Sequence, residues 1–309
     1  MNKIVFVILG PTCTGKTFLA LQLCTKFNGE ILSSDSRQVV KYLDVGTGKI
    51  PGGLDFVIDK KNDCWKVNGI DIRGYDLIEP DKYFSGYDFL VYAREVINNM
   101  KDKKLFIVGG TGFYIDLVTD RAEVSGVKPD IDLRNRLENY TLEKLCRELE
   151  KLNKSKLQNI DQKNKNRLTR AIEIEYARST HETNDFEEKT DKIEYKFIGL
   201  TTSRESLYLF ADKWVDSIWG DLLLEVSKLK HLGFYDSFRL NGIIYKSAKS
   251  FMDNSLSENE ARQQAKYDLH SYIRRQQTWF KRNHDIKWFD IQARGYRQNV
   301  EDFVELHCG

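Results

Sequence analysis

The chain has 309 residues, enough for about two domains of roughly 100–200 residues each. It carries 48 Lys and Arg against 46 Asp and Glu, a net charge of +2, which excludes a uniformly basic coat and an acidic tail. The apolar run Ile4–Leu9 is far shorter than the about 20 residues of a membrane span, so it predicts a buried strand and not a signal peptide. The 5 cysteines show no paired spacing, which disfavours a disulfide framework and a zinc site. We therefore expect a cytoplasmic protein without membrane association.

The first 120 residues alternate between predicted strands and predicted helices. Short apolar runs predict the strands, and apolar residues at helical spacing predict the helices. Such alternation is typical of an α/β protein with a parallel sheet. In chain order the expected elements are a strand at 4–9, a helix at 17–27, a strand at 30–34, a hairpin within 54–72 with its tip at Lys60–Asp63, a helix at 88–100 and a strand at 104–108.

Residues 121–194 differ from the first 120 residues, because they are highly charged and their sequence predicts helices without strands. They hold 16 basic and 16 acidic residues and are therefore neutral in total. Asp130 is expected to cap a helix at their start, and Ser179–Lys192 to form a polar loop. An apolar strand returns at Tyr195–Leu200, followed by a long helix in which Trp214 and Trp219 read as core. We predict a core domain of residues 1–120 and 195–309 and a helical insertion domain of residues 121–194.

A phosphate-binding motif, which we call the P-loop, follows the first predicted strand. Residues 10–17 fit the pattern G-x-x-x-x-G-K-[ST] and lead directly into a helix, which is the context that this motif requires. Glycines allow the backbone N–H groups to turn toward an anion, and the helix N-terminus adds positive potential. Lys16 supplies a point charge, and Thr17 is the expected Mg²⁺ ligand. Cys13 is expected only to fill space in the loop. The predicted diphosphate or nucleotide contacts are Gly10, Pro11, Thr12, Cys13, Thr14, Gly15, Lys16 and Thr17.

The residues that follow the predicted strands indicate which reaction class the P-loop serves. An ATPase or kinase normally shows a strand ending in an aspartate that holds Mg²⁺. The strand at 104–108 ends in Gly-Gly-Thr, whereas the strand at 30–34 leads into Asp35. Because parallel strands end at the same edge of a sheet, we expect Asp35 and Thr111 to converge on the P-loop. The alternative for Asp35 is a capping role in the Ser-Asp-Ser turn.

Seven segments together resemble the tRNA dimethylallyltransferases, also called isopentenyl-tRNA or IPP transferases, of the bacterial type. The resemblance spans nearly the whole chain and implies a P-loop nucleoside-triphosphate-hydrolase-like sheet flanked by helices, with a helical insertion. Three positions depart from the family pattern: Val40 replaces a tyrosine, Asn241 an arginine or glutamine, and Ile244 a glycine. The matching segments are 10–17, 33–39, 43–49, 76–80, 108–114, 167–173 and 275–282.

The resemblance implies transfer of a dimethylallyl group from dimethylallyl diphosphate to N6 of adenosine-37 in tRNA. The P-loop, Lys16 and Mg²⁺ suit the charge that builds on a departing diphosphate. Asp35 is then the carboxylate that accepts the N6 proton, and Thr111 is a second polar contact. The base must leave the anticodon loop to reach such a site. Ser36, Arg37 and Gln38 are expected to hold the flipped nucleotide.

Two regions are the expected contacts for the tRNA anticodon stem-loop. Residues 262–287 hold 7 basic and 2 acidic residues, which predicts an amphipathic helix whose basic face tracks phosphates. The insertion is neutral, so it needs a few well-placed arginines to bind RNA. The alternatives are a solvated helix face for the first region and ion pairs with nearby glutamates for the second. The predicted contacts are Asp35, Ser36, Arg37, Gln38, Thr111, Arg134, Asn166, Arg167, Thr169, Arg170, Arg275, Gln276 and Lys281.

Other functions compete with a tRNA-modifying transferase. A small-molecule P-loop kinase with a helical lid is disfavoured by the missing aspartate after residues 104–108. An adenylate isopentenyltransferase acting on a free nucleotide would not need the insertion and the basic helix. A non-catalytic RNA-binding module would not need the P-loop together with Asp35. No interface signal stands out, so a monomer is expected.

Overall fold

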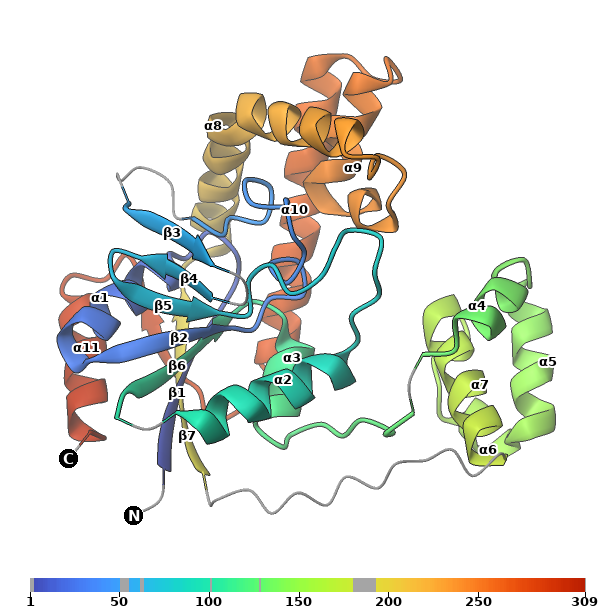
Figure 1. Cartoon of the computed structure of the whole chain (residues 1–309), viewed down its shortest axis with the longest axis horizontal. Helices are drawn as coiled ribbons and strands as arrows, with labels where there is room; N and C mark the ends of the chain where they lie inside the picture. Colours follow the sequence, from blue (N-terminus) through green and yellow to red (C-terminus); the bar gives the residue numbers. More distant parts are fainter. Residues whose placement is uncertain are drawn as a thin grey trace. The chain divides into compact units, whose positions relative to one another are not determined.

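The computed structural model describes residues 3–50, 56–61, 64–100, 102–127, 129–179 and 193–308. Within this part of the chain, eight strands form one sheet in the order β3-β4-β5-β2-β6-β1-β7-β8 (Figure 1). The strands are β1 (Lys3–Leu9), β2 (Gly29–Ser33), β3 (Ile58–Lys61), β4 (Cys64–Val67), β5 (Ile70–Arg73), β6 (Lys104–Gly109), β7 (Ile193–Thr201) and β8 (Lys287–Asp290).

The centre of the sheet is parallel, as the alternating pattern predicted. β1 lies between β6 and β7, and β2 lies between β5 and β6, all in parallel register. β3 and β4 pair antiparallel and form the hairpin expected within 54–72, although its predicted tip lies partly outside the described residues. Because the central strands run in one direction, the segments after β1, β2 and β6 meet at one edge.

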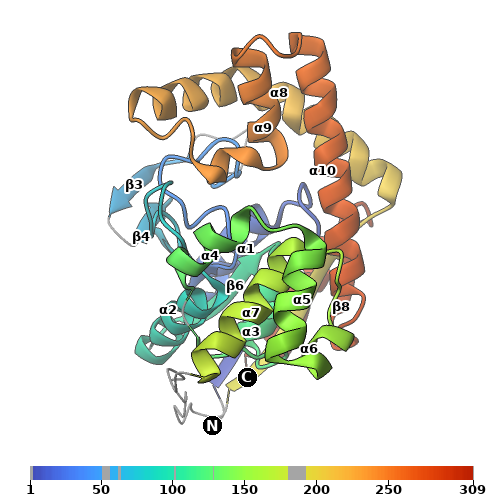
Figure 2. The same ribbon diagram turned by 90° about the vertical axis from the view of Figure 1, so that its right-hand side faces the viewer.

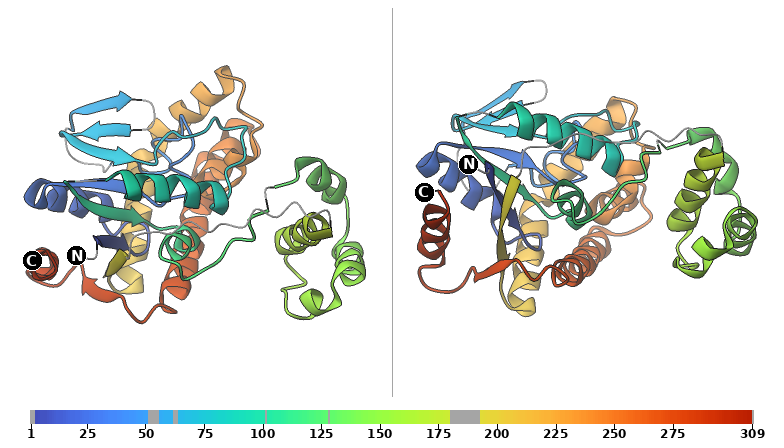
Figure 3. Two further views of the ribbon diagram at one scale, coloured as in Figure 1. Left: turned by 60° about the horizontal axis from the view of Figure 1, so that its bottom comes forward. Right: turned by 90° about the horizontal axis from the view of Figure 1, so that it is seen from below.

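Helices cover both faces of the sheet. The apolar residues of β1 alternate, so Phe6 and Ile8 join a core cluster that also contains residues of α1 and α11. Figure 3 shows α2 and α3 across the opposite face. Helices α8, α9 and α10 pack on one another as a group (Figure 2). The α-helices of the described residues outside 122–189 are α1 (Lys16–Phe27), α2 (Gly86–Asn99), α3 (Gly112–Val118), α8 (Arg204–His231), α9 (Ile243–Met252), α10 (Glu258–Phe280) and α11 (Tyr296–Leu306).

The chain divides into two compact units. The sheet unit comprises residues 1–84, 89–121 and 190–309, and the helical unit comprises residues 85–88 and 122–189. The helical unit has its own apolar cluster around Leu145, Leu149, Leu168 and Ile172. Asp130 caps α4 through a bond from the Leu133 amide, as predicted. The helices of this unit are α4 (Ile131–Glu138), α5 (Leu142–Leu152), α6 (Lys154–Gln158) and α7 (Lys165–Ser179).

Two expectations differ from the structure or lie partly outside the described residues. Residues 180–192 of the predicted polar loop lie outside the described residues, and Ser179 itself ends α7. The basic helix expected to reach residue 287 ends at Phe280, and β8 and α11 follow it. β8 is a four-residue strand with one buried residue, too short for a periodic pattern. Within the described residues no helix is long and apolar enough to cross a membrane.

Candidate active site

The P-loop connects β1 to α1 and has the backbone conformation that its glycines predict. Gly15 precedes α1 with φ 75°, in the left-handed region. Gly10 has φ 143°, and a Cβ there would lie 2.3 Å from the carbonyl oxygen of Leu200 in β7. The side chains of Thr14 and Lys16 both donate to the Pro11 carbonyl, at 2.9 and 2.7 Å. The loop is therefore held closed by its own side chains.

A cavity of about 450 Å³ opens over the P-loop. Its volume lies within the range of small-molecule sites, about 300–1,000 Å³. The strand-end segments after β2 and β6 contribute to its wall, together with side chains from α8, α10 and α11. The lining residues are Thr12, Cys13, Gly15, Lys16, Thr17, Phe18, Asp35, Gln38, Thr47, Gly48, Ile50, Val108, Gly109, Gly110, Phe210, Trp214, Tyr272, Gln276, Tyr296 and Arg297. We call this space the P-loop cavity.

Asp35 and Lys16 face the P-loop cavity and influence each other electrostatically. Burial raises the pKa of Asp35, while the Arg37 backbone N–H, 2.9 Å from Oδ1, and the charge of Lys16 oppose that rise. Burial also lowers the pKa of Lys16 to about 8, against the attraction of Asp35. Asp35 thus makes the turn contact expected of a cap and also lines the cavity as a carboxylate of raised basicity.

Thr111 does not line the cavity, but it holds the turn that contains Asp35. Its hydroxyl oxygen accepts the backbone N–H of Ser36 at 3.0 Å, and its own N–H donates to the Ser34 carbonyl. The structure therefore joins the segment after β6 to the segment after β2, as the strand order predicted. Thr111 contacts the residue beside Asp35 and is not among the residues that line the P-loop cavity.

Gln276, which we expected among the RNA contacts, has a different position in the structure. Its side chain is buried, its Oε1 accepts from the Thr12 amide at 2.9 Å, and its Nε2 donates to the Gly110 carbonyl at 3.0 Å. A Cβ on Gly110 would lie 2.3 Å from that nitrogen. Because both amide atoms are bonded to backbone, Gln276 joins the P-loop to the segment after β6.

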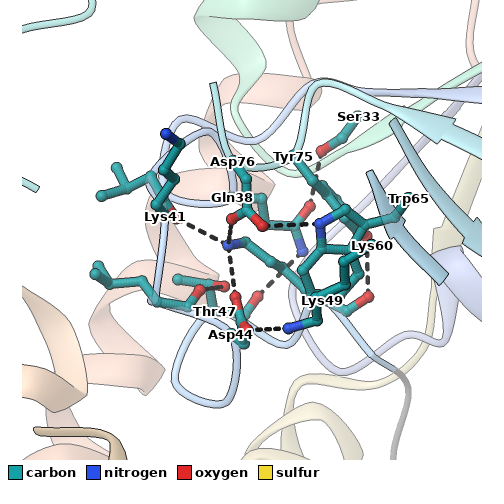
Figure 4. Close-up of polar contacts among 12 residues, drawn as sticks. Ser33, Gln38, Lys41, Asp44, Thr47, Lys49, Lys60, Trp65, Tyr75 and Asp76 are labelled. Atoms are coloured by element: carbon teal, nitrogen blue, oxygen red, sulfur yellow. Dashed lines mark hydrogen bonds and ion pairs between the residues drawn. The ribbon is translucent and has the colours of Figure 1, made fainter. Parts of the chain in front are cut away.

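The loop of residues 44–49, the 44–49 loop, forms another wall of the cavity and is held by a buried lysine. Lys49 has no exposed side-chain surface, and its ammonium group contacts the Val40 carbonyl, Asp44 and Asp76 (Figure 4). Trp65 of β4 donates to the second oxygen of Asp76 at 2.8 Å. This network fixes the 44–49 loop to the β4–β5 hairpin.

Gln38 joins the same wall to β2 (Figure 4). Its Nε2 donates to the carbonyls of Thr47 and Gly48 at 3.1 and 3.3 Å, and its Oε1 accepts from Ser33 at 2.7 Å. We expected Gln38 to hold a nucleotide. Gln38 does line the cavity, but both atoms of its amide form hydrogen bonds within the protein.

Glu225 of α8 holds the other side of the 44–49 loop. Its carboxylate accepts the backbone N–H groups of Asp44, Val45 and Gly46 at 2.7, 2.7 and 3.2 Å, and the hydroxyl of Tyr245 at 2.7 Å. Sequence analysis did not single out Glu225 or Lys49, although Lys49 lies in a segment that carried the family resemblance. Their partners are distant in the chain.

Arg37 lies beside a second arginine that the sequence analysis missed. The Arg37 guanidinium donates to the Arg239 carbonyl at 2.6 Å. Burial lowers the pKa of Arg239, and the positive charge of Arg37 lowers it further. The Arg239 side chain itself donates to the Lys82 carbonyl at 3.1 Å and lies over the ring of Phe238.

The predicted RNA contacts of the helical unit fall into two sets. Arg134 and Arg170 both pair with the buried carboxylate of Glu173, at 2.6 and 3.0 Å. This is the ion pairing that we considered as the alternative to RNA binding. Asn166 and Arg167 are exposed on α7, and Thr169 is half-buried.

On α10 and just beyond it, Arg275 and Lys281 are exposed, with the Arg275 guanidinium over the ring of Tyr272 at 5.6 Å. Two other basic residues of the helix, Arg262 and Lys266, pair with Asp216 of α8. The basic face of α10 is therefore partly neutralised within the protein, and Arg275 and Lys281 form no ion pair with the residues that the structure describes.

The donor set near the P-loop suits a magnesium ion that arrives with a phosphorylated substrate. Thr17 offers a hydroxyl oxygen at the cavity wall. Within the described ranges no group of three or more His, Cys, Asp or Glu side chains could hold a metal ion by itself. Mg²⁺ usually keeps several waters and takes few protein ligands beside substrate phosphates, so these residues fit it.

The cavity also contains aromatic residues whose role we had not predicted. Trp214, interpreted as core from its spacing on the long helix, is half-buried and lines the cavity with Phe210. Trp219 is in the core, as expected, with 1% of its surface exposed. Helical periodicity distinguishes an inward face from an outward face, but it does not distinguish a packed core from a cavity wall.

The parallel sheet and the glycine-containing loop after β1 define a P-loop-like α/β protein. A family model described as IPP transferase matches residues 38–283, and the chain belongs to this family. A curated tRNA dimethylallyltransferase of Anoxybacillus flavithermus is 33% identical over 94% of this chain and 91% of its own length. Another, from Carboxydothermus hydrogenoformans, is also 33% identical, over 98% of this chain and 97% of its own length.

Solved structures agree with this assignment. The tRNA isopentenylpyrophosphate transferase of Bacillus halodurans is 28% identical with a TM-score of 0.69, covering 99% of this chain and 96% of its own. A eukaryotic dimethylallyltransferase acting on tRNA, 21% identical, shares the fold with a TM-score of 0.73 over 99% of this chain and 80% of its own.

Proposed function

We propose that the chain transfers the dimethylallyl group of dimethylallyl diphosphate to N6 of adenosine-37, next to the tRNA anticodon. The observation that carries this proposal is a single cavity lined by both the P-loop and Asp35, in a member of the IPP transferase family. One wall suits a diphosphate and the other offers a proton acceptor. Both reacting groups can therefore be held together in one site.

The P-loop would bind the diphosphate of the donor. Its backbone N–H groups, the N-terminus of α1 and Lys16 provide positive potential where negative charge increases as the allylic C–O bond breaks. Thr17 would hold Mg²⁺, which supplies further charge neutralisation when bound. The bond that breaks joins carbon to oxygen, so the diphosphate leaves intact.

Asp35 would accept the proton of the attacking amine. The N6 lone pair is delocalised into the adenine ring, so the amine is a weak nucleophile. As the C–N bond forms, the N6 proton passes to the Asp35 carboxylate, whose raised pKa favours acceptance. The products are N6-dimethylallyl adenosine, diphosphate and protonated Asp35, which returns its proton to solvent.

The RNA would approach from the side of Ser36 and Arg37. A base flipped from the anticodon loop can be held there, because unstacking costs least in a single-stranded loop. Arg275 and Lys281 are exposed cations of the sheet unit for the phosphate backbone, and Arg167 is one of the helical unit. We infer a cytoplasmic monomer, and light scattering of the purified protein would test the monomeric state.

The direct test is incubation with labelled dimethylallyl diphosphate, Mg²⁺ and unmodified tRNA, followed by nucleoside analysis. We expect the label in N6-dimethylallyl adenosine, and no label in a tRNA whose adenosine-37 is replaced by guanosine. An AMP arm and an ATP arm test the two competing enzymes. Labelled AMP without labelled tRNA, or phosphoryl transfer without prenyl donor, would overturn the proposal.

A further inference from the structure

The P-loop cavity contains few positive charges for a site that binds a diphosphate. Among its lining residues within the described part of the chain, only Lys16 and Arg297 carry cationic side chains. Lys16 already donates to the Pro11 carbonyl at 2.7 Å. A diphosphate carries more negative charge than one ammonium group neutralises. Binding it therefore calls for a second cation at the cavity, and Arg297 is the other cationic residue there.

Arg297 is held at the cavity by aromatic rings and not by a carboxylate. Its guanidinium carbon lies 5.0 Å from the ring centroid of Phe18 and 5.7 Å from that of Tyr296. Its Nε donates to the Tyr296 hydroxyl at 3.2 Å. Across the residues that the structure describes, no ion pair involves Arg297, whereas Arg262, for example, pairs with Glu258 at 2.6 Å. The remaining N–H donors of Arg297 are therefore available to an anion.

Arg297 is exposed, and its backbone is positioned by α11, which lies beside α1 (Figure 1). Val300 and Val304 belong to the same core cluster as residues of α1. Lys26, near the end of α1, pairs with Glu301 at 2.9 Å. Arg297 lies in the first turn of α11 and contacts Phe18, the residue after the P-loop. The two helices thus bring their N-termini to the same cavity, where both dipoles favour an anion.

We propose that Arg297 binds the diphosphate of the prenyl donor as the second cation of the P-loop cavity. This inference rests on the proposed function for the identity of the donor. A guanidinium group offers a planar pair of donors that matches phosphate oxygens, and stacking on aromatic rings leaves those donors free at its edge. Arg297 lies outside residues 38–283, so the family match does not assign it a role.

Binding of inorganic pyrophosphate with Mg²⁺, measured by calorimetry, tests the assignment without any transfer reaction. We expect R297A to bind pyrophosphate about 10- to 100-fold more weakly, the range for a lost hydrogen-bonded charge contact, and R297K to lie between R297A and the unmodified chain. The matched control is R294A, because Arg294 is exposed three residues earlier and does not line the cavity. Equal binding by R297A and R294A would overturn the proposal.

The transfer assay separates this inference from the proposed function. We expect R297A to raise KM for dimethylallyl diphosphate while KM for tRNA stays unchanged. If the unmodified chain transfers no prenyl group but its pyrophosphate binding depends on Arg297, the proposed function fails and the anion contact stands. If transfer occurs and R297A changes neither constant, the anion contact fails and the proposed function stands. Thermal melting of R297A and R297K checks that both variants are folded.

Discussion

Burial shifts the pKa values of two side chains at the P-loop cavity, Asp35 and Lys16, in opposite directions. The pKa of Asp35 is raised, which makes its carboxylate a better proton acceptor. The pKa of Lys16 is lowered, which brings loss of its charge close to neutral pH. Both shifts arise mainly from desolvation, since each group disfavours its charged form away from water.

Replacing Asp35 by asparagine tests proton acceptance. The D35N side chain keeps an oxygen for the Arg37 amide but cannot take the N6 proton. We expect kcat to fall about 100- to 10,000-fold, the usual contribution of a general base, with tRNA affinity retained. Steady-state kinetics and a filter-binding assay give the two quantities. A parallel loss of tRNA binding would instead indicate that Asp35 acts only through the turn.

The pH dependence of kcat/KM for dimethylallyl diphosphate reports both groups in the free enzyme. As pH falls through the raised pKa of Asp35, the carboxylate is protonated and the rate declines. As pH rises past about 8, Lys16 loses its proton and the rate declines again. The K16R variant stays charged and should show no alkaline decline. A profile that is flat to pH 9 would contradict the assignment to Lys16.

At the scale of elements, the 44–49 loop is held from two directions. Glu225 on α8 accepts three of its backbone N–H groups, and Lys49 bonds toward Asp76 beside the β4–β5 hairpin. Since Thr47 and Gly48 line the cavity, the position of this wall depends on both contacts.

Removing the Lys49 ammonium tests how strongly the loop is held. K49M leaves Asp44 and Asp76 without their buried partner, and we expect about 3–5 kcal/mol loss in the free energy of unfolding. K60M is the matched control, because Lys60 pairs with the same Asp44 but is half exposed, so about 1 kcal/mol or less is expected. Urea denaturation measures both. Similar losses for the two variants would show that burial of Lys49 does not matter.

How much of the site the sequence predicts depends on how far apart its partners are in the chain. The P-loop and the strand leading to Asp35 are local patterns, and the structure has both where expected. Gln276 is 264 residues from its partner Thr12, and Glu225 is 181 residues from Asp44. No local pattern distinguishes such residues from exposed polar ones. Arg297 was missed because its contact with Phe18, at the start of α1, joins residues that are far apart in the chain.

At the scale of the whole molecule, two compact units divide the proposed work. The sheet unit contains the P-loop cavity, and the described part of the helical unit contains the helices α4 to α7 around its own apolar cluster. Some predicted RNA contacts are exposed cations, while others are already paired inside the protein. This difference gives distinct expectations for Arg167, Arg275 and Arg170.

Salt dependence of tRNA binding distinguishes phosphate contacts from internal ion pairs. We expect R167A and R275A each to reduce the slope of log K against log salt by about 0.7–0.9, one phosphate contact. R170A should leave the slope nearly unchanged and lower the stability of the helical unit, because it removes a partner of the buried Glu173. Unchanged slopes for R167A and R275A would remove both from the RNA contacts.

The separate apolar cluster of the helical unit has a consequence for how such enzymes diversify. Residues of that unit are packed against one another, so exchanging them need not repack the sheet that carries the chemistry. If Arg167 binds RNA as proposed, exchanging this unit would change the RNA contacts and leave the P-loop cavity of the sheet unit unchanged. Chimaeras that graft residues 122–189 between relatives would test this expectation.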